Sequence, residues 1–222
     1  SMKMPDITRA PVTGKRVLVR VDFNVSLTAD NAIANDRRIR EAIPTIEYLL
    51  KKKAVVVLLS HLGRPKGVQK ELSLSGVAKR LGEILGRPVL FLEEYLTAAA
   101  FDHIAGLAPG SVVLCENVRF YRGEEENDPA FARKLSRLGD VFVNDAFGTA
   151  HRTHASTIGI TACLPSYAGL LFTREVNLIS EAIHRPKRPL VVIIGGGKTP
   201  EKIRVIEKLL DVADTIYLGG AV

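Results

Sequence analysis

The sequence predicts an α/β fold in which a doubly wound parallel sheet has helices on both faces. Apolar runs recur along the 222 residues, and most are continuous rather than alternating. Continuous Val/Ile/Leu runs are typical of strands buried on both faces of a parallel sheet. Helical patterns separate them, which favours βαβ units and a Rossmann-like arrangement. We expect strands at Val17–Phe23, Ala54–Leu59, Pro88–Leu92, Val112–Leu114, Val141–Val143, Leu190–Ile194 and Thr215–Leu218.

The segments between these runs carry apolar residues at helical spacing. Two of them open with a capping residue followed by proline, Asp128-Pro129 and Thr199-Pro200, which is a common way to begin a helix. Helices are expected at Arg38–Lys53, Ser73–Gly86, Pro129–Gly139, Ala168–His184 and Pro200–Ala213.

Composition is that of a globular protein. Hydrophobic residues make up 46% and charged residues 25% of the chain, which excludes disordered, collagen-like and coiled-coil proteins. The net charge of +7 is compatible with an anionic partner without identifying one.

Cysteine usage and hydropathy predict a cytoplasmic protein. Cys115 and Cys163 cannot form a disulfide framework and lack metal-ligand spacing. The N-terminal residues contain no apolar core of a secretion signal. No apolar run approaches the roughly 18 residues that a membrane span needs, so no membrane partner is expected.

The chain is expected to have three parts. Residues 1–167 would form an N-terminal domain, residues 168–186 a connector helix that ends in a Pro-rich linker, and residues 187–222 the beginning of a second α/β domain. Two strands and one helix cannot bury a core alone. We therefore expect a truncated second domain, and self-association through residues 187–222 because open strand edges tend to pair.

Polar side chains follow the predicted strands where the strands end. Carboxyl ends of parallel strands share one edge of a sheet, and ligands bind there. Arginine forks bind carboxylate or phosphate, and Asp or Asn suits a hydroxyl. The pattern predicts a small substrate with anionic groups and a hydroxyl, although a single Arg is more often a surface residue. The candidate residues are Asp22, Phe23, Asn24, Arg38, His61, Leu62, Gly63, Arg64, Arg119 and Arg152.

Two further motifs have alternative interpretations. His151 and His154 have the spacing of a metal pair on a helix, but no further ligand is placed, and a hydrogen-bonded structural His is the alternative. Gly196, Gly197 and Lys198 lie between a strand and a helix, where backbone N–H groups bind phosphate. A Walker A loop would need glycine at position 192, which is Val192, so the alternatives are another phosphate-binding turn or a plain tight turn.

Four strings in this order resemble phosphoglycerate kinases, and the similarity extends from about Val12 to the last residue. They are Val17-Leu-Val-Arg-Val-Asp-Phe-Asn-Val, Ser60-His-Leu-Gly-Arg-Pro, Glu116-Asn-Val-Arg-Phe and Asn144-Asp-Ala-Phe-Gly-Thr-Ala-His-Arg.

The resemblance implies a two-lobed kinase. The N-terminal lobe would bind 3-phosphoglycerate or 1,3-bisphosphoglycerate through the strand-end residues named above, and the C-terminal lobe would bind MgATP or MgADP. Arg38 and Lys198 would act on the transferring phosphoryl group, and Lys202 on the nucleotide phosphates. The protein ligand of Mg²⁺ is expected beyond residue 222, with no metal site within this chain.

The resemblance therefore implies reversible phosphoryl transfer between 1,3-bisphosphoglycerate and ADP, which gives 3-phosphoglycerate and ATP. The full-length parent would be a monomer, and these 222 residues alone would have little activity. The alternative is a non-catalytic, single-lobe protein that binds phosphoglycerate or another anion. A nucleic-acid partner is not expected, because the arginines lie singly at strand ends rather than in a basic stripe.

Overall fold

The computed structural model describes residues 4–195, 206–207 and 209–219. The chain divides into two compact units, Ser1–Thr173 and Arg174–Val222. This division falls inside helix α6, Leu170–His184. The expected boundaries at 167 and 186 stay predictions.

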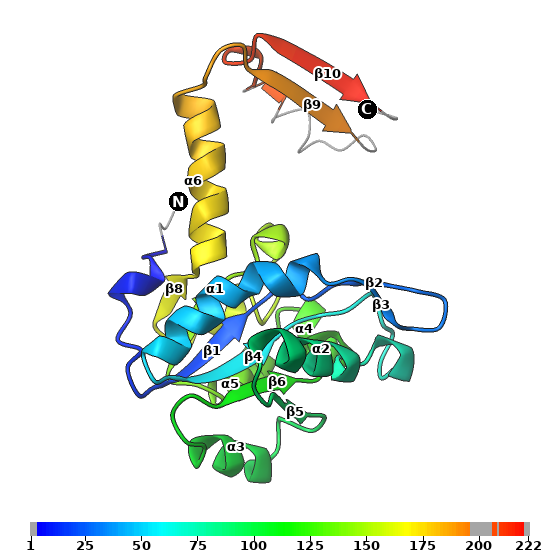
Figure 1. Cartoon of the computed structure of the whole chain (residues 1–222), viewed down its shortest axis with the longest axis vertical. Helices are drawn as coiled ribbons and strands as arrows, with labels where there is room; N and C mark the ends of the chain where they lie inside the picture. The colour runs from blue at the N-terminus through cyan, green and yellow to red at the C-terminus, as the bar shows by residue number, and fades with distance from the viewer. Residues whose placement is uncertain (1–3, 196–205, 208, 220–222) are drawn as a thin grey trace. The chain divides into compact units, whose positions relative to one another are not determined.

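The first unit is built on a six-stranded sheet with the order β5-β6-β4-β1-β7-β8 (Figure 1). All neighbouring strands pair in parallel, as the continuous apolar runs predict. The strands are β1 Arg16–Arg20, β4 Val55–Leu59, β5 Leu90–Leu92, β6 Val112–Cys115, β7 Val141–Asn144 and β8 Ser166–Ala168, and a small antiparallel pair is formed by β2 Ser26–Leu27 and β3 Ile33–Asn35.

Five helices connect these strands, and a sixth follows β8. Two begin at side-chain caps, Thr97 before α3 and Asp128 before α5, which satisfy free backbone N–H groups of the first turn. The helices are α1 Arg37–Lys51, α2 Ser75–Leu85, α3 Ala98–Ala105, α4 Arg122–Glu125, α5 Pro129–Ser136 and α6 Leu170–His184.

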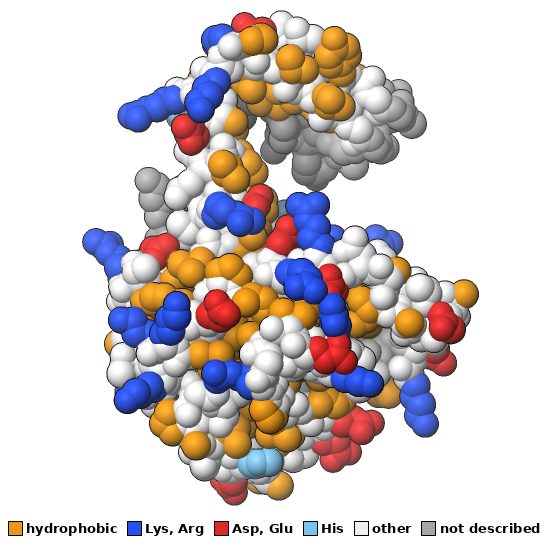
Figure 2. Space-filling view, viewed as in Figure 1, with side chains coloured by type: hydrophobic (Ala, Val, Ile, Leu, Met, Phe, Trp, Pro, Cys, Tyr) orange, Lys and Arg blue, Asp and Glu red, His pale blue; other side chains and the backbone are white. Residues whose placement is uncertain are grey.

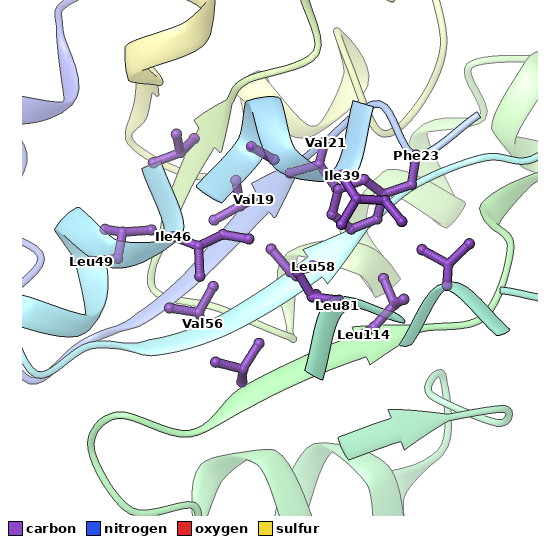
Figure 3. Packing of buried hydrophobic residues seen from close by; sticks show 14 of the residues in the cluster. Val19, Val21, Phe23, Ile39, Ile46, Leu49, Val56, Leu58, Leu81 and Leu114 are labelled. Carbon is purple, nitrogen blue, oxygen red and sulfur yellow. The ribbon is translucent and has the colours of Figure 1, made fainter. Parts of the chain in front are cut away.

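Two hydrophobic clusters cover the two faces of the sheet. Side chains alternate along a strand, so Val19 of β1 packs with α1 and α2, whereas Leu18 packs with α3 and α5. Figure 3 shows the first cluster, in which Ile46 of α1 and Leu81 of α2 lie over Leu58 of β4. The sheet is therefore buried on both faces.

The strand order changes direction at β1. β1 lies between β4 and β7. The chain leaves β1 toward β4 and later crosses to the other side of β1 with β7. In α/β sheets, ligands bind beyond the carboxyl ends of the strands where the strand order changes direction in this way.

The α/β fold is confirmed, with corrections in detail. The run Val17–Phe23 continues past the end of β1 at Arg20, because Val21 and Phe23 are buried in a loop rather than in the sheet. Strand β8 and helices α3 and α4 were not expected, since three or four residues carry too little periodicity and α3 is rich in alanine. Half of the helix expected at Pro200–Ala213 lies outside the described residues.

The second unit contains a parallel pair, β9 Val191–Gly195 and β10 Thr215–Gly219. Many large hydrophobic side chains of its described residues are exposed, and Figure 2 shows several of them in orange. They include Leu178, Val191, Ile193, Tyr217 and Leu218.

Glycine is required at position 139 by close packing. A Cβ there would lie 2.9 Å from Leu18 Cβ and 3.1 Å from Leu18 N. We expect Gly139→Ala to lower the free energy of unfolding by about 1–3 kcal/mol, measured by urea denaturation. Gly76→Ala is the matched control: nothing lies within 4 Å of its Cβ position in helix α2, so it should raise stability by up to about 1 kcal/mol. Equal effects of the two changes would contradict this packing argument.

Candidate functional site

The loops after β1, β4 and β6 are joined by hydrogen bonds at the carboxyl edge of the sheet. Ser60 follows β4, and its Oγ accepts from Phe23 N at 2.8 Å. Its carbonyl oxygen accepts from Val118 N at 3.1 Å. Ser60 therefore fixes the loop after β1 and the loop after β6 against the end of β4.

Two buried residues after β6 extend this framework. Asn117 Nδ2 donates to the carbonyl oxygens of Leu62 and Leu72, at 2.8 and 2.9 Å. The Glu116 carboxylate accepts from Leu74 N at 2.9 Å and from Ser73 Oγ at 2.6 Å, just before helix α2. The connection from β4 to α2, residues 60–74, is therefore held near both of its ends.

Asp22 lies between the first helix and the loop after β7. Its Oδ2 forms an ion pair with Arg38 at the start of α1, and its Oδ1 accepts from Asn24 N at 3.2 Å. A Cβ at Gly148 would lie 2.9 Å from Asp22 Oδ2, so the β7 loop passes close to this carboxylate. Arg38 remains about half exposed.

Asn24 and Arg119 bind opposite ends of the same glycine. Asn24 Oδ1 accepts from Gly63 N at 2.8 Å, and Arg119 Nη1 donates to Gly63 O at 2.7 Å. Gly63 has φ +65°, and a Cβ there would lie 2.8 Å from Leu72 Cδ2. This conformation requires glycine, so the Leu-Gly-Arg string has a structural reason.

Arg119 carries unsatisfied donors. Its side chain is 2% exposed, and its buried Nε and Nη2 have no hydrogen-bond partner among the described residues. Glu125 Oε1 lies 3.8 Å from Nε, beyond hydrogen-bond distance. Leaving charged donors buried and unpaired is costly, so these two N–H groups are suited to an anionic ligand that accepts from both.

His61 is buried and neutral. Burial first, and then the positive charges of Arg20, Arg119, Arg152 and Arg38, lower the pKa of His61 to about 2. Arg152 and Arg64 likewise contribute to lowering the pKa of Arg119, after burial as the larger cause. Because their charges interact, the predicted arginines and His61 belong to one cluster of positive charge.

Arg20 belongs to this cluster and was missed by the sequence reasoning. It ends β1, is fully buried, and its Nη2 donates to His61 Nδ1 at 3.1 Å. Its Nε donates to Ser156 Oγ at 2.8 Å, and Ser156 Oγ donates to Glu124 Oε1 at 2.6 Å. The available signal was an arginine inside an apolar strand, since buried charges are nearly always paired. No pattern marked Ser156 or Glu124.

Some predicted residues contribute differently than expected. The side chains of Phe23 and Leu62 are in the hydrophobic core, so any role in binding falls to their backbone groups. Arg64 is exposed, and its positive charge acts on Arg119. The nucleotide-side residues lie outside the described residues: Gly196, Gly197, Lys198 and Lys202.

The metal-pair interpretation of the two histidines is wrong in its geometry. His151 is exposed and His154 is buried, and neither lies on a helix. His154 Nδ1 is 3.8 Å from Glu124 Oε1, beyond hydrogen-bond distance, and has no hydrogen-bond partner among the described residues, so a hydrogen bond of this ring stays a prediction. In the part of the chain that the structure describes, no group of three or more His, Cys, Asp or Glu could hold a metal ion.

Comparison with known proteins identifies the family. The family model "Phosphoglycerate kinase" matches residues 7–222. The chain belongs to the phosphoglycerate kinase family.

Several phosphoglycerate kinases are similar over nearly the whole chain. The enzyme of Dictyoglomus turgidum is 51% identical over 97% of this chain, and that of Nostoc sp. 52% identical over 96%. The structure of phosphoglycerate kinase from Coxiella burnetii matches 98% of this chain with TM-score 0.84 and 40% identity. The chain spans 54% of each of those two relatives and 55% of the Coxiella chain, about half of their length.

Three observations concern the cofactor and the location. Phosphoglycerate kinases generally use Mg²⁺ with a nucleotide. One similar phosphoglycerate kinase, from Arabidopsis thaliana, is named as chloroplastic. None of the described helices is long and apolar enough to cross a bilayer.

The depressed pKa of His61 predicts a pH-dependent stability. The folded chain keeps His61 neutral, whereas the unfolded chain binds a proton below about pH 6.5. The unfolded state therefore gains protons as pH falls, and the free energy of unfolding decreases by about 1.4 kcal/mol per pH unit for this residue. Burial also lowers the pKa of His154, which adds to the decrease.

His61→Gln should reduce this slope by one proton between about pH 6.5 and pH 5, measured by urea unfolding at several pH values. The His154 contribution and the carboxylates remain common to both proteins. Identical pH dependence of the two proteins would contradict a neutral, buried His61.

Proposed function

We propose that residues 1–173 form the phosphoglycerate-binding part of a phosphoglycerate kinase. The complete enzyme would transfer a phosphoryl group reversibly between 1,3-bisphosphoglycerate and ADP, giving 3-phosphoglycerate and ATP. The observation that carries the proposal is the buried Arg119 fork with two unpartnered N–H groups, beside the neutral His61 and the other arginines. A site of this kind gains most from an anion that enters it.

The other groups of the site fit the rest of the substrate. A phosphate or carboxylate would accept from the Arg119 fork and from Arg152, since guanidinium pairs with such groups bidentately. The hydroxyl of a glycerate would donate to Asp22, which already accepts from Asn24 N. Gly63 and Arg64 would line the anion.

The reaction needs charge stabilisation rather than a base. The acceptor in the direction of 1,3-bisphosphoglycerate synthesis is a carboxylate, which has no proton to lose, and phosphoryl transfer depends mainly on positioning and on cations around the equatorial oxygens. Arg38 is about half exposed at the start of α1, so it can reach a transferring phosphoryl group.

The nucleotide half of the reaction would fall to the second unit. Gly196, Gly197, Lys198 and Lys202 would bind the phosphates of MgATP or MgADP, and Lys198 would follow the transferring group. Mg²⁺ would neutralise charge on the nucleotide phosphates. The described residues contain no acidic cluster fitted to it, and no step is assigned to them through the metal.

The chain covers about half the length of its relatives. Three further proposals concern these 222 residues and the complete protein. These 222 residues alone bind phosphoglycerate and turn it over slowly or not at all. The complete protein is a monomer in the cytoplasm, while this chain self-associates through residues 187–222, whose described part exposes apolar side chains such as Ile193 and Tyr217. Nucleic acid is not a partner. A non-catalytic anion-binding protein is the alternative that the next experiment tests.

Titration calorimetry with 3-phosphoglycerate tests the site. We expect binding by this chain, and a dissociation constant raised roughly tenfold to a hundredfold by Arg119→Met, because hydrogen bonds to a charged group are lost. Arg122→Met is the matched control: Arg122 is 89% exposed and pairs with Glu126, so the affinity should not change.

The anions and nucleotide used decide between the alternatives. Binding of 3-phosphoglycerate in preference to inorganic phosphate or sulfate supports a phosphoglycerate site, whereas equal binding of all three supports an unspecific anion-binding protein. MgADP titrated separately should bind weakly or not at all. Near-full turnover in a coupled kinase assay would contradict the proposed dependence on further residues of the family fold.

A further inference from the structure

Arg20 occupies an unusual position at the centre of the sheet. It is the last residue of β1, its side chain is fully buried, and its guanidinium donates in three directions. Nη1 donates to the carbonyl oxygen of Val21, Nε to Ser156 Oγ, and Nη2 to His61 Nδ1. Every nitrogen of the guanidinium therefore has an acceptor, in contrast to Arg119.

Chemistry fixes the direction of each hydrogen bond in the series that joins Glu124, Ser156, Arg20 and His61. A guanidinium can only donate, so Ser156 Oγ and His61 Nδ1 must accept from it. Ser156 Oγ then uses its own proton toward Glu124 Oε1 at 2.6 Å, and its backbone N–H donates to Glu124 Oε2 at 2.9 Å. Glu124 is fully buried. The Glu124 carboxylate thus ends this series of hydrogen bonds on the side away from His61.

We propose that Arg20 is a positioning residue that fixes the tautomer of His61, with the proton on Nε2. In this form Nδ1 is an acceptor occupied by Arg20, and Nε2–H is a donor available to an anionic ligand. Ser156 and Glu124 hold the guanidinium in place. The inference rests on the proposed function for the identity of that anion.

The tautomer matters because the two ring nitrogens interact oppositely with an anion. Nε2–H donates a hydrogen bond to a carboxylate or phosphate oxygen, whereas an unprotonated Nε2 directs its lone pair at that oxygen. Among the described residues, the His61 ring has one hydrogen bond, at Nδ1. The low pKa of His61 agrees with this arrangement, since burial first, and then the charges of Arg20, Arg119, Arg152 and Arg38, oppose a positive ring.

The first experiment observes the tautomer in the unmodified chain without ligand. Two-bond ¹H–¹⁵N spectra of the histidine-labelled chain, with His61 assigned through His61→Gln, should give a pyrrole-like Nε2 and a pyridine-like Nδ1. The signals should stay unchanged between about pH 7 and pH 5. A protonated Nδ1, an average of both tautomers, or titration near the ordinary pKa would overturn the proposal.

The second experiment separates positioning from structural support. Arg20→Met removes the donor at similar length, and His61 should then show a mixture of tautomers. Arg16→Met is the matched control, because Arg16 lies at the other end of β1 and pairs with Asp140 at 2.7 Å. Both changes lower stability, but the control should leave the tautomer unchanged. An unchanged His61 spectrum in folded Arg20→Met would overturn the proposal.

Ser156→Ala serves where Arg20→Met does not fold. It removes the acceptor of Arg20 Nε, so the guanidinium is less well held and the two tautomers of His61 should begin to average. His61 signals identical to those of the unmodified chain would show that Ser156 does not hold the Arg20 guanidinium, and would overturn that part of the proposal.

Affinity for 3-phosphoglycerate links the tautomer to binding. Arg20→Met should weaken binding roughly tenfold, and it should weaken it no further in a chain that already carries His61→Gln. Full additivity would show that Arg20 acts on the anion independently of His61, and would overturn the proposal. If the unmodified chain does not bind 3-phosphoglycerate, the proposed function fails, while the ligand-free spectra still decide the tautomer.

Discussion

A buried positive charge at the end of the central strand constrains the rest of the site. Arg20 is fully buried, and a buried charge persists only where acceptors and a countercharge accompany it. Ser156 and Glu124 meet that need from the loop after β7 and from α4. Because the same guanidinium also binds His61 after β4, one side chain links the loops that follow β4 and β7.

The fold was largely predictable because burial on both faces leaves a strong sequence signal. Five of the seven apolar runs coincide with strands of the six-stranded sheet, since a parallel sheet between two helical layers has few polar positions. The other two coincide with β9 and β10 of the second unit. The elements that were missed lack that signal. β8 is a three-residue strand at the sheet edge, and the order β5-β6-β4 depends on tertiary packing that no single segment encodes.

The site was predictable where it depends on topology and unpredictable where it depends on side-chain partners. Carboxyl ends of parallel strands share an edge, so Asp22, His61, Arg119 and the β7 loop could be brought together from the sequence. The interaction of Arg20 with Ser156 spans 136 residues, and no local pattern announces it. Phe23 stands at the same strand end as Asp22, but its side chain is in the hydrophobic core, which its position in the sequence does not reveal.

The two buried arginines of the site, Arg20 and Arg119, differ in their hydrogen bonding. Each guanidinium nitrogen of Arg20 has an acceptor, whereas Arg119 is held through one nitrogen by Gly63 O and has two nitrogens without a hydrogen-bond partner among the described residues. Had a carboxylate satisfied Arg119 fully, the unliganded fold would be more stable, but an anion would have to displace it. A backbone carbonyl fixes the guanidinium without neutralising it. The positive charge that disfavours a protonated His61 is therefore the same charge that the ligand would neutralise.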